Sequence, residues 1–348
     1  MEPKTIDAVR ASVQLNCYIS DARYSGDYGL CTYLLKMREF FRWEQGLGFE
    51  APLDNDEVGA WLSDRESLWK GLEAQDFEPI RIGTRVLDPF DEAAINPLLR
   101  EYGLVYSGGI GAYGKPHFFL AELERREQHA EYDLVVAGRE LARDLSAPPA
   151  MTREGSIYIR RESLRRMLWE KYESWRWRRV DNPLGRALSC YPFETDLQTA
   201  LERMSDAQME QLLLHERGES LAGEWLGDGW NQMLQALAGT PAELAARAVR
   251  DHLADCWVTL PAIIEGRRDA DLHFFVGNLS AMRKSLFPAL RTGYDQWQRQ
   301  QRYQPLHALA ERALEHWRSL ARAMLELHAT DGSDAAASIH ALAQSHAL

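Results

Sequence analysis

The chain has 348 residues, of which 45% are hydrophobic and 26% charged, and its formal net charge is -12 at pH 7. The length allows two domains with substantial cores, and the negative charge argues against a surface made for nucleic acid or anionic membranes. The N-terminus has no basic region followed by an apolar run, and no stretch approaches the roughly 20 apolar residues of a membrane span. We therefore expect a cytoplasmic protein without a membrane span.

The four cysteines lie far apart and form no C-x-x-C motif; they are Cys17, Cys31, Cys190 and Cys256. This spacing disfavours a structural zinc site of cysteines and a disulfide scaffold. We expect reduced thiols, with a pair between Cys17 and Cys31 left open.

Apolar residues recur every three or four positions over 12–46 and 56–75, which predicts helices. The period then changes to two, which predicts short strands at 79–87, 104–107, 118–123, 133–136 and 156–160. A short helix is predicted between them at 92–101. The first part of the chain, residues 1–182, is therefore expected to be an α+β domain with a small antiparallel sheet.

From Glu162 onward the pattern is almost entirely helical. The break at Asn182-Pro183-Leu184-Gly185 marks the candidate domain boundary, so that residues 183–330 form a helical bundle. The tail, 331–348, is rich in Asp, Ser and Ala and is expected to fray. The predicted fold class is mainly α, or α+β overall.

Two helix starts stand out within the predicted bundle. Thr240-Pro241-Ala242-Glu243 combines an N-cap threonine, a proline at the first helical position and the glutamate of a capping box. Ser205-Asp206-Ala207-Gln208 has a similar pattern. We expect one helix to begin at each.

Acidic residues lie where the apolar stripes of these two helices should continue. On the Ser205 helix the stripe leads to Glu216, with His215 and Glu219 four residues apart on an adjacent face. On the Thr240 helix it leads to Asp251, His252 and Asp255. Burying an unpaired carboxylate costs several kcal/mol, so these residues need partners.

A divalent cation would supply such a partner. Histidine and carboxylates from facing helices are how helical bundles build iron, manganese or magnesium sites. The predicted metal ligands are His215, Glu216, Glu219, Asp251 and Asp255. His252 is predicted to be a further ligand or the catalytic acid–base.

The same carboxylates have a second explanation. Arg247 and Arg250 lie within reach of Asp251, and Arg217 neighbours Glu216. A buried network of arginines and carboxylates would account for the pattern without a metal. The spacing contains neither H-E-x-x-H nor the Glu-x-x-His pairs of di-iron bundles, so it does not choose between the two.

The segment Gly109–Gly114 matches G-x-G-x-x-G, but a strand rather than a helix is expected after it, which argues against a dinucleotide site. A turn between two strands is the favoured interpretation. The alternative is a loop that closes over an anionic ligand, with Lys115 and His117 nearby.

The segment Arg160–Arg179 holds eight Lys or Arg residues, three Glu residues and interleaved Trp and Tyr. Arginine beside aromatic rings can bind single-stranded nucleic acid. In so acidic a chain we instead expect the aromatic rings to pack and the arginines to meet the protein's own carboxylates. Nucleic acid is therefore not expected as a partner.

The segments Asn16–Arg23, Gly29–Cys31 and Arg38–Glu44 resemble an uncharacterised bacterial protein family with no assigned function. The resemblance extends through both acidic patches and so covers most of the chain. It implies no activity. It adds three polar residues to the candidates, namely Asp21, Arg23 and Glu44.

The leading functional prediction is an enzyme that depends on a divalent metal (Fe, Mn or Mg) and acts on a small-molecule substrate by hydrolysis or oxidation. The alternative is a non-catalytic binding or assembly factor, with structural arginine–carboxylate networks and a protein partner. The sequence indicates no oligomeric state.

Overall fold

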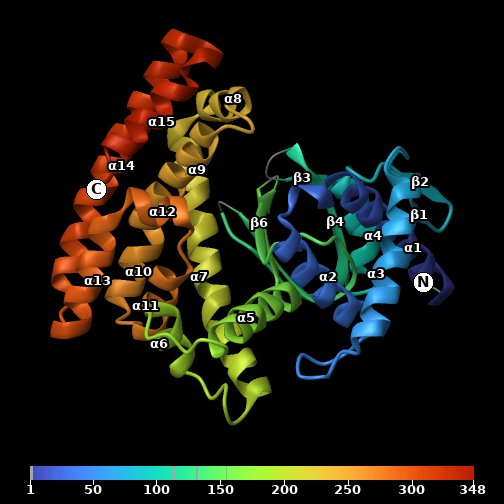
Figure 1. Cartoon of the computed structure of the whole chain (residues 1–348). Helices are drawn as coiled ribbons and strands as arrows, with labels where there is room; N and C mark the ends of the chain where they lie inside the picture. Colours follow the sequence, from blue (N-terminus) through green and yellow to red (C-terminus); the bar gives the residue numbers. More distant parts are fainter. Residues whose placement is uncertain (1–2, 112–113, 131, 154) are drawn as a thin grey trace. The chain divides into compact units, whose positions relative to one another are not determined.

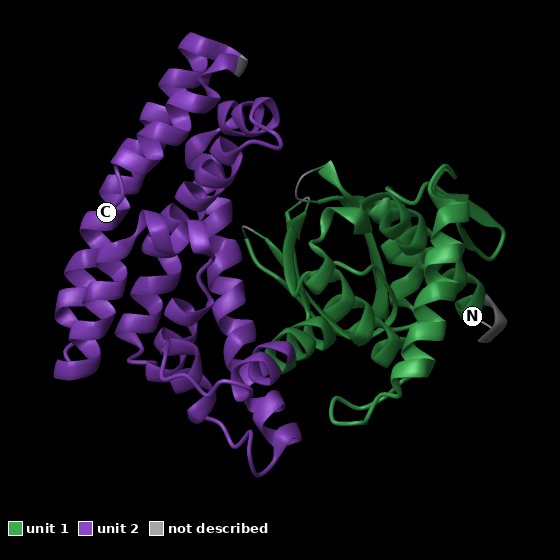
Figure 2. Ribbon diagram, viewed as in Figure 1, with its two compact units in different colours: residues 1–169 green, residues 170–348 purple. Residues whose placement is uncertain are grey.

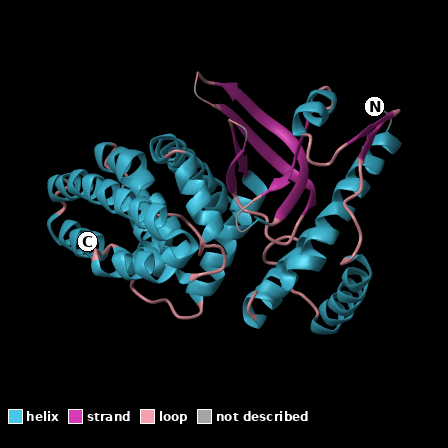
Figure 3. Cartoon of the chain, turned by 90° about the horizontal axis from the view of Figure 1, so that it is seen from above, coloured by secondary structure: helices cyan, strands magenta, loops and turns pink. Residues whose placement is uncertain are grey.

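The structure is a computed structural model, and it describes the chain apart from residues 1–2, 112–113, 131 and 154. Two compact units divide the chain at residue 169 (Figure 2). Unit 1, residues 1–169, combines helices with strands. Unit 2, residues 170–348, is helical throughout its described elements (Figure 3). The predicted fold class, mainly α with an α+β N-terminal part and a helical C-terminal part, is confirmed.

Unit 1 begins with three α-helices and a short 3-10 helix, and its strands follow them in the chain (Figure 1). Its helices are α1 (Pro3–Tyr24), η1 (Ser25–Asp27), α2 (Leu30–Glu44), α3 (Asn55–Leu72), α4 (Glu92–Arg100) and α5 (Arg161–Arg176), the last of which crosses the division. Its strands are β1 (Ile80–Ile82), β2 (Arg85–Leu87), β3 (Leu104–Ile110), β4 (Pro116–Gln128), β5 (Asp133–Arg143), β6 (Ala150–Arg153) and β7 (Ser156–Arg160).

The five-stranded sheet of unit 1 has the order β3-β4-β5-β7-β6, and β1 and β2 form a separate hairpin. Neighbouring strands are antiparallel except β5 and β7, which are parallel. After β5 the chain forms β6 at the edge of the sheet. It then returns as β7, which lies between β5 and β6 and is parallel to β5. The sequence analysis did not identify β6, which has only four residues and follows Pro148-Pro149.

A single buried carboxylate, Glu92 at the start of α4, contacts both ends of this sheet. It accepts hydrogen bonds from the Ser107 hydroxyl (2.5 Å) and the Gly108 amide (3.0 Å) on β3. It also accepts one from the Tyr158 hydroxyl on β7 (2.9 Å) and pairs with Arg153 on β6 (3.0 Å). The sheet is therefore curled, and Glu92 joins its two edges.

Residues of β3 allow the two edges of the sheet to approach each other. A Cβ at Gly109 would lie 1.1 Å from a guanidinium nitrogen of Arg153, so only glycine leaves room for that side chain. The Asn96 side chain of α4 donates to the Tyr106 carbonyl and accepts from the Tyr106 amide, both at 2.9 Å. The outer edge of β3 is thus capped by side chains of α4 instead of another strand.

The two faces of the sheet have separate cores. One face packs under α1 and α4 through residues such as Val13, Ile95 and Leu120. The other face carries a smaller cluster around Phe119, whose neighbours include Tyr158 of β7. The alternation of side chains along β4 places consecutive residues on opposite faces.

Unit 2 is a set of helices around one large apolar core. The helices are α6 (Pro183–Ser189), α7 (Leu197–Leu226), α8 (Asp228–Ala236), α9 (Pro241–Ala254), η3 (Asp255–Thr259), α10 (Leu260–Glu265), α11 (Asp269–Asn278), α12 (Ala281–Leu286), α13 (Pro288–Gln300), α14 (Gln304–Asp331), η4 (Gly332–Ala335) and α15 (Ala336–Ser345). Fraying was predicted after residue 330, but α15 buries Ile339 and Ala343. No helix in the described part of the chain is long and apolar enough to cross a membrane.

The predicted helix start at Thr240 is confirmed. Its hydroxyl accepts from the Glu243 amide (3.3 Å), and the Glu243 carboxylate accepts from the Gly239 amide (2.8 Å). The start predicted at Ser205 is wrong: α7 begins at Leu197, where Asp196 caps it, and Ser205 is buried within the helix. A capping pattern indicates where a helix could begin, but it does not show whether the residue already lies inside a longer helix.

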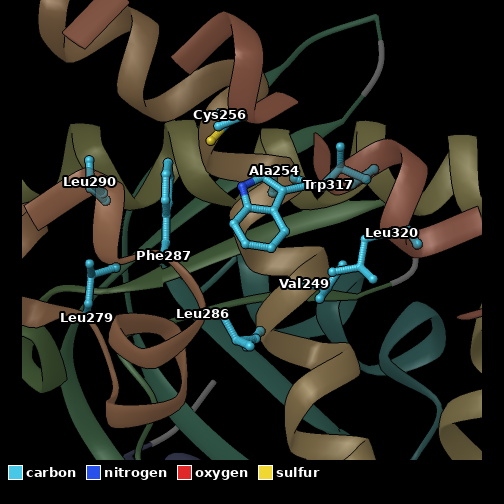
Figure 4. Close-up of a cluster of buried hydrophobic side chains, with 14 of the residues drawn as sticks. Val249, Ala254, Cys256, Leu279, Leu286, Phe287, Leu290, Trp317 and Leu320 are labelled. Atoms are coloured by element: carbon cyan, nitrogen blue, oxygen red, sulfur yellow. The ribbon is translucent and has the colours of Figure 1, made fainter. Parts of the chain in front are cut away.

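Figure 4 shows the centre of the unit 2 core, where Trp317 of α14 lies among Phe287, Val249 and Leu320. The Cys256 thiol is buried in the same cluster. This core fixes α9, η3 and α14 relative to one another, and α9 and η3 carry three of the residues in the predicted site.

We expect Glu92→Gln to lower the stability of unit 1 by roughly 1–3 kcal/mol, because an amide cannot accept from both edges of the sheet and also balance Arg153. The measurement is urea unfolding followed by circular dichroism. Glu101→Gln, at the exposed C-terminal end of the same helix, is the matched control. Equal stability of the two variants would show that Glu92 does not hold the sheet edges together.

Candidate functional site

The predicted residues on α7 and α9 do come together. A Cβ at Gly218 would lie 2.5 Å from the Ala254 carbonyl oxygen, so this glycine allows α7 to approach the end of α9 closely. At that crossing, His215 Nδ1 lies 2.8 Å from Asp255 Oδ1. His215 Nε2 lies 3.5 Å from a carboxylate oxygen of Glu219.

Arginines supply the remaining partners. Arg283, from α12, pairs with the second oxygen of Asp255. Arg250 lies 2.9 Å from Glu219 and 3.9 Å from Asp251. We call this set the α7–α9 network; its members are His215, Glu219, Arg250, Asp251, Asp255 and Arg283.

The charges in the α7–α9 network reinforce one another. Burial opposes a charged His215, but Asp255 and Glu219 outweigh it and raise the pKa of the imidazole well above its usual value. Burial likewise opposes a charged Asp255, yet Arg283 and His215 lower the pKa of that carboxyl. The histidine is therefore a cation at neutral pH, with its ring held between two carboxylates.

Asp251 and Glu216 lie at the border of the network. Burial raises the pKa of Asp251 to about 6, although Arg283 lowers it. Glu216 is buried, and its charge acts on Arg250. The carboxylates that His215 contacts are those of Asp255 and Glu219.

The sixth predicted residue, His252, points elsewhere. Its ring stacks on Trp317 at 4.9 Å between centroids, and its Nε2 lies 2.9 Å from the Arg283 carbonyl oxygen. Burial lowers the pKa of His252 to about 3, so the ring is neutral. His252 packs against Trp317 and Phe287, two residues of the apolar core that Figure 4 shows, and it contacts the network only through Arg283.

The prediction of an enzyme that depends on a divalent metal is wrong. Among the described residues, no group of three or more His, Cys, Asp or Glu side chains is arranged to hold a metal ion. Asp255 is occupied by His215 and Arg283, and Glu219 by Arg250. The buried carboxylates thus have cationic side chains as partners.

A second concentration of buried charge lies in unit 1. Arg143 at the end of β5, Arg160 at the end of β7 and Arg166 on α5 are all at least nine-tenths buried, and together they form what we call the arginine cluster. Arg160 Nε donates to Glu140 at 2.9 Å, and Ser163 donates to the same oxygen at 2.5 Å.

Phe119 of β4 lies at the centre of the arginine cluster. Arg143 pairs directly with it across the sheet, and the guanidinium carbon of Arg160 lies 4.5 Å from its ring centroid. His117 precedes Phe119 by two residues, which places it on the same face of β4. Arg143 and His117 therefore share the face of the sheet on which Arg160 lies over the Phe119 ring.

Basic and acidic side chains are buried together at this place, since Glu140 and Asp144 lie beside Arg160. Burial and the nearby charge of Arg143 lower the pKa of Arg166 to about 10. Burial and the charges of Arg160 and Arg153 lower the pKa of His117, against the opposing effect of Asp144. Glu140 remains ionised, because Arg160 and Arg143 outweigh its burial and lower its pKa.

Several donors of the cluster are not used. Buried nitrogen atoms without a hydrogen-bond partner among the described residues are Arg143 Nε and Nη1, Arg160 Nη1 and Nη2, and His117 Nε2. Arg143 Nη1 does lie 3.7 Å from Glu140, as an ion pair. Buried polar groups are almost always hydrogen-bonded, so five such atoms around one ring require an explanation.

The glycine-rich segment lies beside this cluster as a hairpin turn between β3 and β4, as favoured from the sequence. Residues 112–113 are outside the described part. Lys115 pairs with Asp27 at 2.6 Å and lies over the Tyr24 ring. A Cβ at Gly111 would lie 2.9 Å from His117 Nδ1, so the turn packs directly on that histidine.

The arginines at the start of the basic segment meet carboxylates, as expected. Arg160 pairs with Glu140, Arg161 with Glu124 and Arg166 with Glu162. Sequence reasoning noted these arginines but missed the cluster. Arg160 ends a strand that was predicted at 156–160, but Arg143 lies beyond the strand predicted at 133–136, because β5 continues to Arg143.

The three polar residues suggested by the family resemblance lie in separate places. Asp21 accepts from the Leu145 amide, close to Arg143. Arg23 donates to the Glu73 carbonyl. Glu44 binds Arg65, at 2.6 Å.

We expect Asp251→Asn to stabilise unit 2 increasingly as the pH rises from 4 to 7. The carboxyl titrates near pH 6 when folded and near pH 4 when unfolded, so the parent protein loses stability as the pH rises through this interval. An asparagine has no such loss, and the gain should reach about 1–3 kcal/mol. Thermal melts across this pH range measure it. A difference that does not change with pH would contradict the burial of an ionised Asp251.

Comparisons with known proteins agree with the two-part organisation. Residues 8–160 match the N-terminal domain, and residues 165–346 the C-terminal domain, of a family of unknown function, DUF6866. No curated protein and no solved structure is significantly similar to the chain. Because the two matches cover nearly all of it, the chain belongs to the DUF6866 family.

Proposed function

We propose that unit 1 binds a small molecule through an anionic group, which the arginine cluster receives beside Phe119. The observation that carries this proposal is the set of buried nitrogen donors on Arg143, Arg160 and His117 that have no hydrogen-bond partner in the described chain. Oxyanions are the natural partners of such donors, since guanidinium groups bind them with short, charge-assisted hydrogen bonds.

The energetic argument concerns the cost of leaving these donors unpaired. A buried donor without a partner costs roughly 1–3 kcal/mol, and more if it is charged. The carboxylate of Glu140 accepts from both Arg160 and Ser163 through Oε1, while its Oε2 is buried without a hydrogen-bond partner among the described residues. An anion that accepts from the remaining nitrogens would remove the penalty and also offset the repulsion between Arg143 and Arg166.

The geometry is suited to binding with little rearrangement. Arg160 is held by Glu140 and by the Phe119 ring, and Arg143 lies over the Phe40 and Trp43 rings. Guanidinium groups fixed in this way lose little side-chain entropy when a ligand binds. Burial lowers the pKa of His117, and its Nε2 also lacks a hydrogen-bond partner among the described residues.

The α7–α9 network supports no comparable proposal. Each of its buried carboxylates has a cationic partner, and the imidazole of His215 is in contact with two of them. Its ion pairs join α7 to α9, η3 and α12 within unit 2. The function that we propose therefore resides in unit 1.

We expect small anions to raise the melting temperature of the parent protein at constant ionic strength, but not that of Arg143→Met. A ligand at 100 times its Kd contributes about 2.7 kcal/mol. Without ligand, the variant should melt no lower than the parent, because Glu140 keeps Arg160 and Ser163 as partners.

The matched control is Arg139→Gln, an exposed arginine on the same strand that pairs with Glu122. It should retain the full anion-induced shift. An equal loss of the shift in both variants, or no shift in the parent protein with any anion, would rule out the arginine cluster as the binding site.

A further inference from the structure

We infer that the first two turns of α2 form a surface on which a second copy of the chain docks, so that two copies associate through unit 1. The surface consists of Leu30, Cys31, Leu34 and Leu35, and we call it the α2 patch. It does not depend on the anion site proposed above. Three observations carry the inference: the exposure of the patch, its lack of charge, and the opposite charges at its two ends.

The α2 patch is apolar and open to solvent. Leu30 is 71% exposed, Leu34 44% and Leu35 55%, and Cys31 is an exposed free thiol. Residues 30 and 34, like residues 31 and 35, are four apart, so the side chains form two adjacent rows along one side of the helix. Single exposed apolar residues are common on protein surfaces, whereas a contiguous group marks an interaction site.

The core of unit 1 does not account for the patch. The cluster that holds α2 in place takes Met37 and Phe40, which lie farther along the helix, with Tyr33 at its margin. The three leucines of the patch are not among the residues of that cluster. Burying a leucine side chain is worth roughly 1.5–3 kcal/mol, so a partner that covers these leucines gains a substantial part of that free energy.

The charges in and around the α2 patch indicate a second copy as the partner. No residue from Leu30 to Leu35 is charged, although the chain carries a net charge of -12, so two patches can meet without like charges opposite each other. Asp27 precedes the patch, and Lys36 and Arg38 follow it. In an antiparallel pair of α2 helices, the acidic end of one copy lies opposite the basic end of the other, and the helix dipoles also attract.

This pairing is two-fold symmetric, because the same patch serves in both copies. Within each copy Asp27 already pairs with Lys115, and Arg38 with Glu39, so the charged ends contribute more to orientation than to affinity. Four side chains are far fewer than the roughly 20–30 residues that each partner contributes to a stable complex. We therefore expect a reversible dimer, with a Kd on the order of 10–100 µM.

The first test is sedimentation velocity of the full chain under reducing conditions, from about 5 to 500 µM, a range that brackets the expected Kd. The parent protein should pass from monomer to dimer. Salt should strengthen the dimer, because it screens the repulsion between two acidic chains and leaves the apolar contact intact. A protein that stays monomeric throughout would overturn the inference. A dimer that weakens with salt would show that opposite charges, rather than the α2 patch, join the copies.

Two variants locate the contact. Leu34→Glu introduces a carboxylate into both halves of the interface and should weaken dimerisation at least tenfold. The matched control is Leu244→Glu on α9, because Leu244 is a helical leucine of nearly the same exposure, 45%. It should dimerise like the parent protein. Circular dichroism and melting curves show that both variants are folded. Equal dimerisation of the two variants would exclude the α2 patch.

Cross-linking provides a second measurement that does not depend on a change in the leucines. Cys31 and Cys190 are exposed, whereas Cys17 and Cys256 are buried. Packed helices lie about 8–10 Å apart, so a bis-maleimide of similar span should link two copies through Cys31 in a Cys190→Ser background. Replacing Cys31 by serine as well should abolish the link. Failure of Cys31 to cross-link at concentrations where the dimer forms would also overturn the inference.

Discussion

The curvature of the sheet in unit 1 depends on one carboxylate. Glu92 binds β3 through Ser107 and Gly108, and β6 and β7 through Arg153 and Tyr158. These strands are at opposite ends of the sheet order, so an open, flat sheet would separate the partners. By holding the ends together, Glu92 maintains the curl that faces the inner side chains toward one another. The residues of the arginine cluster that surround Phe119 come from β5 and β7, which follow β4 in the sheet order.

Both units bury charge in networks of arginines and carboxylates. In unit 2 the carboxylate of Asp255 lies between an imidazolium and a guanidinium, and Glu219 has Arg250, although Arg250 Nε and Arg283 Nε lack a hydrogen-bond partner among the described residues. In unit 1 Arg143 and Arg160 share Glu140, and a larger share of their nitrogens lacks such a partner.

Local features of the fold could be predicted from the sequence. The bounds of α4 and β7 and the capping box at Thr240 depend on neighbouring residues, and the structure reproduces them. Contacts between distant segments could not be predicted in the same way. Helical periodicity placed Asp255 on a buried stripe, but its partner Arg283 lies 28 residues away on another helix. Without that partner, a metal was an equally consistent explanation of the same carboxylates.

The same limit explains why the arginine cluster escaped the sequence analysis. Arg143 and Arg160 each end a strand, and β6 lies between those strands in the chain without any clear signal of its own. Alternation along a strand predicts which side chains share a face, but it does not predict that a sheet curls. Once the order of the strands is known, the buried arginines become the unusual feature of unit 1. Buried polar groups are almost always hydrogen-bonded, and the nitrogens of Arg143 and Arg160 that lack a partner among the described residues are the observation on which the proposed anion site depends.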